Sequence, residues 1–92
     1  SLEERQARLT RARKLMAEPP AWLDALFEEM IAQQRARLLG IARSLNPRLT
    51  GDDVLSPDDF PELAGDPRFC YEDGLLAGLL SAQIAVRARG RE

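Results

Sequence analysis

The sequence contains no histidine and a single cysteine, Cys70. Without histidine, the chain lacks the side chain that most often serves as a general base near neutral pH and as a metal ligand. One cysteine excludes a disulfide or a thiolate metal cluster within one chain, and we expect Cys70 to be a buried thiol. No glycine-rich phosphate loop is present either, since Gly74 and Gly78 do not follow a predicted strand. The residues therefore imply no cofactor.

Long apolar segments are also missing. The most apolar stretch, residues 74–86, would span only about 20 Å as a helix, whereas the hydrocarbon core of a bilayer is about 30 Å thick. We therefore expect no membrane span. The charged residues Glu3, Glu4 and Arg5 stand where a secretion signal would be apolar. Together with the lone cysteine, they predict a cytoplasmic protein.

The charges are balanced overall but unevenly distributed. The formal net charge of the 92 residues is −2, so nothing global indicates nucleic acid or a membrane surface as partner. Residues 1–49 carry nine Arg and Lys against six Asp and Glu, and residues 50–74 carry one Arg against eight acids. A chain of this length forms one domain, with an acidic segment between two mildly basic ones.

Residues 20–45 show the most regular helical pattern, with large apolar side chains on one half of a helical wheel. Pro19 and Pro20 stand at its start and Asn46-Pro47 at its end, as is typical of helix boundaries. We therefore expect a helix over 20–45 that lies on the protein core. Its predicted core-facing residues are Trp22, Leu23, Leu26, Phe27, Met30, Ile31, Leu38, Ile41 and Leu45.

Residues 1–18 predict a peripheral basic helix over 2–17. Ser1, followed by Glu3 and Glu4, is typical of a helix start. The apolar stripe of this helix is thin and consists of Leu2, Leu9, Ala12 and Met16. A run of bases without acids would be the contact surface of a nucleic-acid-binding regulator: Arg5, Arg8, Arg11, Arg13 and Lys14. These bases are scattered around the helical wheel, which favours a solvent-exposed surface with no binding role. Nucleic acid is therefore a less expected partner than protein.

Residues 46–66 predict a structured acidic loop rather than a flexible linker, because they are dense in turn-forming residues. Thr50 precedes Asp53 at the spacing of a capping box and predicts one short helical turn. Ser56-Pro57 predicts a second turn with Ser56 as its N-cap. Four apolar residues are spaced to attach the loop to the core: Val54, Leu55, Phe60 and Leu63.

Asp66-Pro67 repeats the cap-and-proline pattern and predicts a third long helix over 67–89. The middle of this helix is apolar all round, but it divides by size. One half carries Leu75, Leu76, Leu79, Leu80, Ile84 and Val86. The other half carries Gly74, Ala77, Gly78, Ser81, Ala82 and Ala85. Because glycine costs about 1 kcal/mol relative to alanine inside a helix, its two glycines indicate close approach by another helix.

A helix that is apolar all round must be covered on both sides. The helix over 20–45, the thin first helix and the loop can cover the large half, but they are too few to cover the small half as well. A second copy of the chain, packed through the small residues across a two-fold axis, is the simplest cover. The sequence thus predicts an all-α fold, a small bundle of three main helices completed by homodimerisation.

The acidic residues support one further alternative, a metal-dependent small-molecule enzyme. Eight of them lie within residues 52–73: Asp52, Asp53, Asp58, Asp59, Glu62, Asp66, Glu72 and Asp73. Their spacing does not match a calcium-binding loop, and most are explained as caps and first-turn charges. Glu28 and Glu29 also lack the second acid of a Glu-x-x-Glu pair.

We therefore expect a non-enzymatic interaction or accessory protein, with a second copy or another protein as its partner. The nucleic-acid-binding regulator and the metal-dependent enzyme are the two alternatives.

Overall fold

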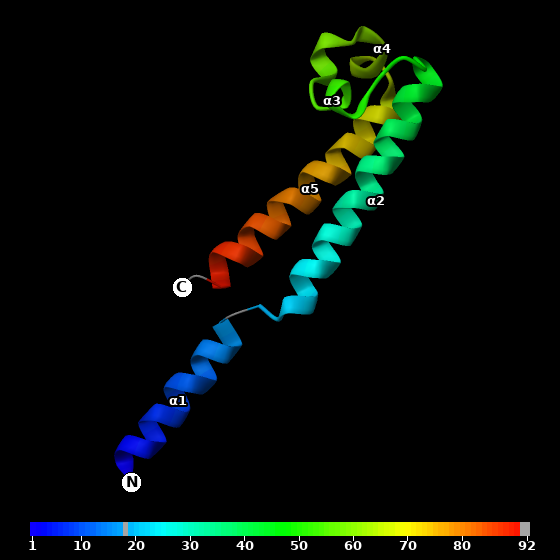
Figure 1. The fold of residues 1–92 in the computed structure, drawn as a ribbon. Coiled ribbons are helices and arrows are strands. Elements are labelled where there is room, and N and C mark those ends of the chain that lie inside the picture. Colours follow the sequence, from blue (N-terminus) through cyan, green and yellow to red (C-terminus); the bar gives the residue numbers. More distant parts are fainter. Residues whose placement is uncertain (18, 91–92) are drawn as a thin grey trace.

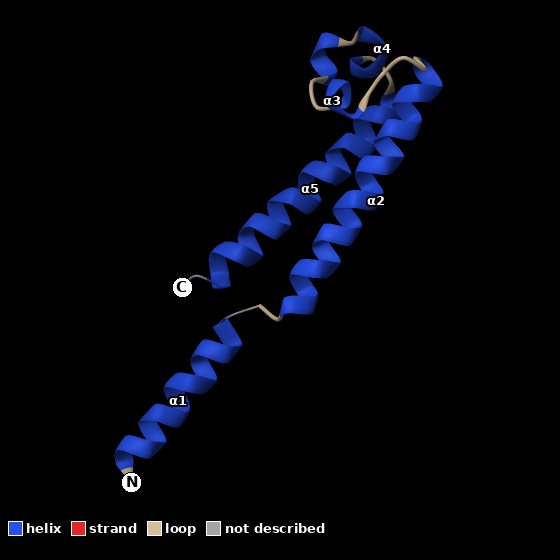
Figure 2. Ribbon diagram, viewed as in Figure 1, coloured by secondary structure: helices blue, strands red, loops and turns tan. Residues whose placement is uncertain are grey.

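The computed structural model describes residues 1–17 and 19–90, and these residues form helices without any strand. The long helices are α1 (Leu2–Ala17), α2 (Ala21–Leu45) and α5 (Pro67–Gly90). Between α2 and α5 lie the short helices α3 (Gly51–Val54) and α4 (Pro61–Ala64), with a 3₁₀ turn, η1 (Pro57–Asp59), between them. Figure 2 shows this helical content along the chain. The all-α prediction is confirmed, and each long helix begins and ends within one residue of its predicted bounds.

The centre of the molecule is a hairpin of two antiparallel helices, α2 and α5, closed at one end by α3, η1 and α4 (Figure 1). Helix α1 extends away from the open end of this hairpin. The extents are therefore 68 × 18 × 18 Å, with a radius of gyration of 19.8 Å. A compact domain of this length would have a radius of gyration of about 12 Å. The structure thus shows an elongated hairpin with an appended helix and does not confirm the predicted bundle of three main helices.

The hydrophobic core lies at the closed end of the hairpin. Among the described residues, eight apolar side chains are buried: Ile31, Leu38, Ala42, Leu49, Val54, Leu63, Phe69 and Leu76. They come from α2, from α5 and from the segment between these two helices, so the loop is part of the core as predicted. Leu55 is the exception among the four predicted loop anchors, because its side chain is exposed.

Side-chain hydrogen bonds cap the starts of α3 and α5. The Thr50 Oγ1 accepts a hydrogen bond from the Asp53 N–H at 3.3 Å, and an Asp53 carboxylate oxygen accepts one from the Thr50 N–H at 2.9 Å. This is the predicted capping box. Asp66 Oδ1 accepts from the Phe69 N–H at 2.8 Å and so caps α5. The prediction for Ser56 is wrong: its side chain makes no cap bond, and its main-chain carbonyl accepts from the Asp59 N–H instead.

In the first half of α2 the predicted core face is only partly right: Leu23 and Phe27 are half-buried, but three other predicted core residues are exposed. Trp22 is 66% exposed, and Leu26 and Met30 are also exposed. The reason is that α5 covers one side of this half only, while α1 points away from it (Figure 1). Near the other end of α2, Leu45 is exposed as well. The apolar stripe is therefore wider than the surface that this chain offers to cover it.

The prediction of a buried Cys70 is also wrong, because the thiol is exposed. Cys70 follows the buried Phe69 on α5, and one residue along a helix turns the side chain by about 100°. Its Sγ lies 3.4 Å from the carbonyl oxygen of Ala64.

Candidate interaction surface

The small residues of α5 lie on its outer side, away from α2. All six predicted interface residues are exposed: Gly74, Ala77, Gly78, Ser81, Ala82 and Ala85. Among the described residues, nothing lies within 4 Å of a Cβ built on Gly74 or Gly78. The two glycines therefore do not serve close packing inside the chain, and the surface that we call the small face of α5 is open.

The opposite side of α5 packs on α2 and contains a polar residue that the sequence did not place there. Phe69 and Leu76 are buried, and so is Gln83. The Gln83 Nε2 donates a hydrogen bond to Glu28 Oε1 at 2.8 Å, which satisfies the buried amide. The division of α5 by size thus corresponds only roughly to its buried and exposed sides. Leu75 and Ile84, which belong to the large half, are exposed.

Large apolar side chains are exposed on both α2 and α5. Trp22, Leu26 and Met30 follow one another at intervals of four residues and so form one exposed row on α2. On α5, Tyr71 and Ile84 are 69% and 66% exposed. An exposed apolar row such as the one on α2 is typical of an interaction site.

Two polar clusters hold the hairpin together, one of them near its closed end. The Gln34 side-chain amide donates to the carbonyl oxygen of Glu72 at 2.8 Å and to its carboxylate at 2.7 Å. The Arg37 Nη1 lies 3.5 Å from the same carboxylate. Glu72 is thereby satisfied within the hairpin, which removes it from the set of candidate metal ligands.

The second cluster lies at the open end and is centred on Arg87. Its guanidinium donates to both carboxylate oxygens of Asp24, at 2.8 and 3.3 Å, and to Glu28 Oε1 at 2.8 Å. The hydrogen bond from Arg87 lowers the pKa of Asp24, and the bond from Asp24 raises the pKa of Arg87. These ion pairs are structural, since they join α2 to α5.

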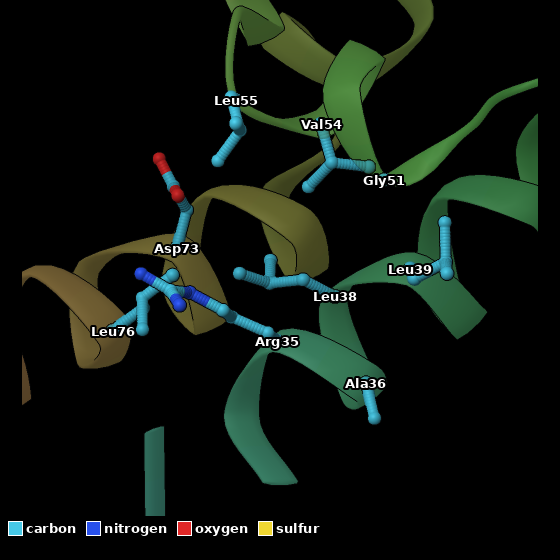
Figure 3. A pocket seen from close by; sticks show the side chains of 9 residues that line it. All are labelled: Arg35, Ala36, Leu38, Leu39, Gly51, Val54, Leu55, Asp73 and Leu76. Carbon is cyan, nitrogen blue, oxygen red and sulfur yellow. The ribbon is translucent and has the colours of Figure 1, made fainter. Parts of the chain in front are cut away.

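A pocket opens at the closed end, between α2, α3 and α5 (Figure 3). Its volume is about 400 Å³. The lining is mostly apolar, with Arg35 and Asp73 as its charged members, and consists of Arg35, Ala36, Leu38, Leu39, Gly51, Val54, Leu55, Asp73 and Leu76. Sequence reasoning missed this pocket. Its lining residues come from α2, from α5 and from the α3 segment, which are distant from one another in the sequence. The exposed side chain of Leu55 is the one signal that would have indicated the pocket, and the sequence did not predict that exposure.

The structure does not gather the basic residues of α1 into one surface. Arg5, Arg8, Arg11 and Arg13 are exposed at different angles around the helix. Lys14 belongs to α1, but its side chain lies outside the described residues. A groove that follows a phosphate backbone needs its bases on one side, so this arrangement does not favour a nucleic-acid interface.

The acidic residues are similarly dispersed. Asp53 and Asp66 cap helices, and a Glu62 carboxylate oxygen accepts a hydrogen bond from the Asn46 amide at 3.2 Å. Within residues 1–17 and 19–90, no three acids or sulfur ligands lie close enough together to hold a metal ion. The described acids therefore do not form a single cluster.

Comparison of the chain with models of known protein families, with curated proteins and with solved structures finds no match. None of the helices in the described part of the chain is both long enough and apolar enough to cross a bilayer. The conclusions on function therefore rest on the surface itself, which is that of an all-α hairpin with much of its apolar surface exposed.

Proposed function

We propose that this protein is a non-enzymatic interaction module that acts as a homodimer, with the small face of α5 as the main contact. The observation that carries the proposal is the exposure of all six small residues on a helix whose middle part is apolar on every side. In water, such a helix is stabilised by covering both sides. Helix α2 covers one side, and a second α5 is the matching cover for the other.

The total surface of the chain supports self-association. Its accessible surface is 7037 Å² for a mass of 10.3 kDa. A compact monomer of that mass exposes about 5,400 Å², so this chain exposes roughly 1,600 Å² more than expected. Stable protein interfaces bury about 1,200–2,000 Å² in total over both partners. The excess surface of each chain is thus ample for one interface of ordinary size.

The shape of the small face favours a copy of itself as the partner. Glycine and alanine allow two helix backbones to approach closely, and a two-fold axis brings the same residues of both chains into contact. Tyr71, Leu75 and Ile84 lie around this surface and would be buried at its edges. A helix of 24 residues, as α5 is, extends about 36 Å and offers enough length for such a contact.

The test compares the molecular masses of the Gly78→Leu variant and the wild type, measured by sedimentation over a range of concentrations. We expect the wild type to be a dimer and the variant to have half its mass. Leucine adds the same bulk to both chains of the symmetric contact, and overpacking costs about 1–3 kcal/mol at each site. The variant should keep its helix content, since leucine favours helix over glycine by somewhat under 1 kcal/mol.

Gly40→Leu is the matched control. Gly40 also lies inside a long helix, and a Cβ built on it meets nothing within 4 Å among the described residues. It belongs to α2, outside the small face, so this variant should remain a dimer. A wild-type monomer at high micromolar concentration would contradict the proposal. So would a Gly78→Leu variant that dimerises as well as the control does.

A further inference from the structure

The pocket at the closed end of the hairpin has a mostly apolar lining. Leu38 and Leu76 form its floor from α2 and α5, while Val54 and Leu55 project over it from the α3 segment (Figure 3). At about 400 Å³ it is larger than one leucine side chain and suits a bulky side chain together with part of the helix that carries it. The occupant must therefore present an apolar side chain from a protruding element.

The charges around this pocket indicate a basic occupant. The segment 50–66, which contains α3, η1 and α4, has six acids and no base. Asp73 adds a carboxylate to the pocket lining itself, and Asp52 is exposed on α3 beside the lining residue Gly51. Arg35 is the single base among the lining residues. A cationic helix would thus be attracted to this end of the molecule.

Helix α1 has the complementary composition. Its 16 residues contain five bases and two acids, a net charge of +3. Leu2, Arg5, Leu9 and Arg13 lie along one side, at the spacing of successive turns. Both leucines are exposed, and no side chain described in residues 1–13 is buried. Because isolated helices of this length are marginally stable in water, α1 gains stability by packing against a partner.

We propose that the pocket binds α1 of a second copy of this chain, with Leu9 in the pocket and Arg5 and Arg13 beside the carboxylates at its edge. This inference rests on the proposed self-association and adds to it a contact separate from the small face of α5. In a two-fold pair, each chain would place its α1 in the other's pocket, which closes the assembly.

The direction in which α1 leaves the hairpin favours α1 of a second copy, and not α1 of the same molecule, as the occupant of the pocket. Pro20 has φ −64° and ψ 149°, the extended geometry of polyproline, so α1 continues away from the hairpin. Pro19 lies directly before it and restricts the same connection. The pocket is lined in part by α3, which lies at the closed end of the hairpin, at the opposite end of the molecule from α1 (Figure 1).

Cysteine cross-linking of full-length chains tests the proposal. In a Cys70→Ser background, a Leu9→Cys chain is mixed with a Leu55→Cys chain that carries a distinguishable mass tag, and the mixture is mildly oxidised. We expect a covalent heterodimer by mass spectrometry, since disulfides form only when the two Cα atoms come within about 7 Å. Arg11→Cys, on the opposite side of α1, replaces Leu9→Cys in the control and should give no heterodimer. Adding Arg5→Glu to the Leu9→Cys chain should strongly reduce the product.

Four results would overturn this inference. One is the absence of the Leu9–Leu55 heterodimer while wild type sediments as a dimer, which would leave the α5 contact standing. Another is a chain with both cysteines that cross-links within itself at high dilution, since α1 would then occupy its own pocket. The third is a monomeric wild type, which would remove the proposed homodimer as well. An equal yield from Arg11→Cys would likewise show that the cross-link reports chance collision and not docking.

Discussion

The guanidinium of Arg87 binds Asp24 through two hydrogen bonds, from Nε at 2.8 Å and from Nη2 at 3.3 Å. The two residues are separated by 63 positions in the sequence. They join the start of α2 to the end of α5, while Gln34 and Glu72 join the same helices nearer the closed end. Since few apolar side chains are buried at the open end, these polar contacts specify how the two helices align there.

Acid should weaken this ion pair. Arg87 lowers the pKa of Asp24, so the contribution of Asp24 to stability is fully present above its unfolded pKa of about 3.9. This contribution is lost as the pH falls from there through the lowered pKa of the folded state. The raised pKa of Arg87 has no effect in this range, because arginine is protonated in both states. We therefore expect Asp24→Asn to be less stable than wild type near pH 7 and closer to it near pH 2, in urea denaturation. A constant difference at both pH values would contradict this.

The two predicted caps of the loop should respond differently to alanine. Thr50→Ala removes the side-chain half of the capping box and should lower the free energy of unfolding by about 1 kcal/mol. Ser56→Ala should leave it nearly unchanged, because the Ser56 hydroxyl caps nothing. Chemical denaturation of both variants checks this contrast. Equal losses would show that the hydroxyl of Ser56 contributes after all.

Two aromatic residues on the first turns of α5 provide a test of where the core lies. Phe69 is 1% exposed, and its replacement by alanine should lower the free energy of unfolding by about 3–5 kcal/mol. Tyr71→Ala, two positions later, should have a small effect on the unfolding of the dilute protein, because the ring is exposed. Thermal melts at low concentration separate this loss of core packing from any effect on assembly.

Removal of residues 1–17 should leave a cooperatively folded protein. No side chain of residues 1–13 is buried, and α1 extends away from the closed end of the hairpin, where the described core lies (Figure 1). Circular dichroism should show a sharp melt, with the helix signal reduced by the content of α1. A broad, non-cooperative melt would show that α1 contributes to the folding of the hairpin itself.

Local patterns in the sequence determined the helices. Proline, asparagine and capping residues fix helix ends through steric restriction and hydrogen bonds to near neighbours. The Thr50–Asp53 capping box and the Asp66 cap could therefore be predicted, and so could the bounds of α1, α2 and α5. Ser56 shows the limit of this reasoning. Its hydroxyl and its main-chain carbonyl are two possible acceptors in the same turn, and the carbonyl accepts the hydrogen bond from the Asp59 N–H.

Only the tertiary structure decided which apolar residues are covered. Periodicity placed Trp22, Leu26 and Met30 on the same stripe as Ile31 and Leu38, yet α5 covers one side of α2 and the short helices cover only its end. The pocket and the Arg87–Asp24 pair likewise depend on how helices distant in sequence align. A helical pattern specifies which side of a helix is apolar, because that depends on neighbours three and four positions away. What packs on that side depends on the path of the whole chain, which no local pattern contains.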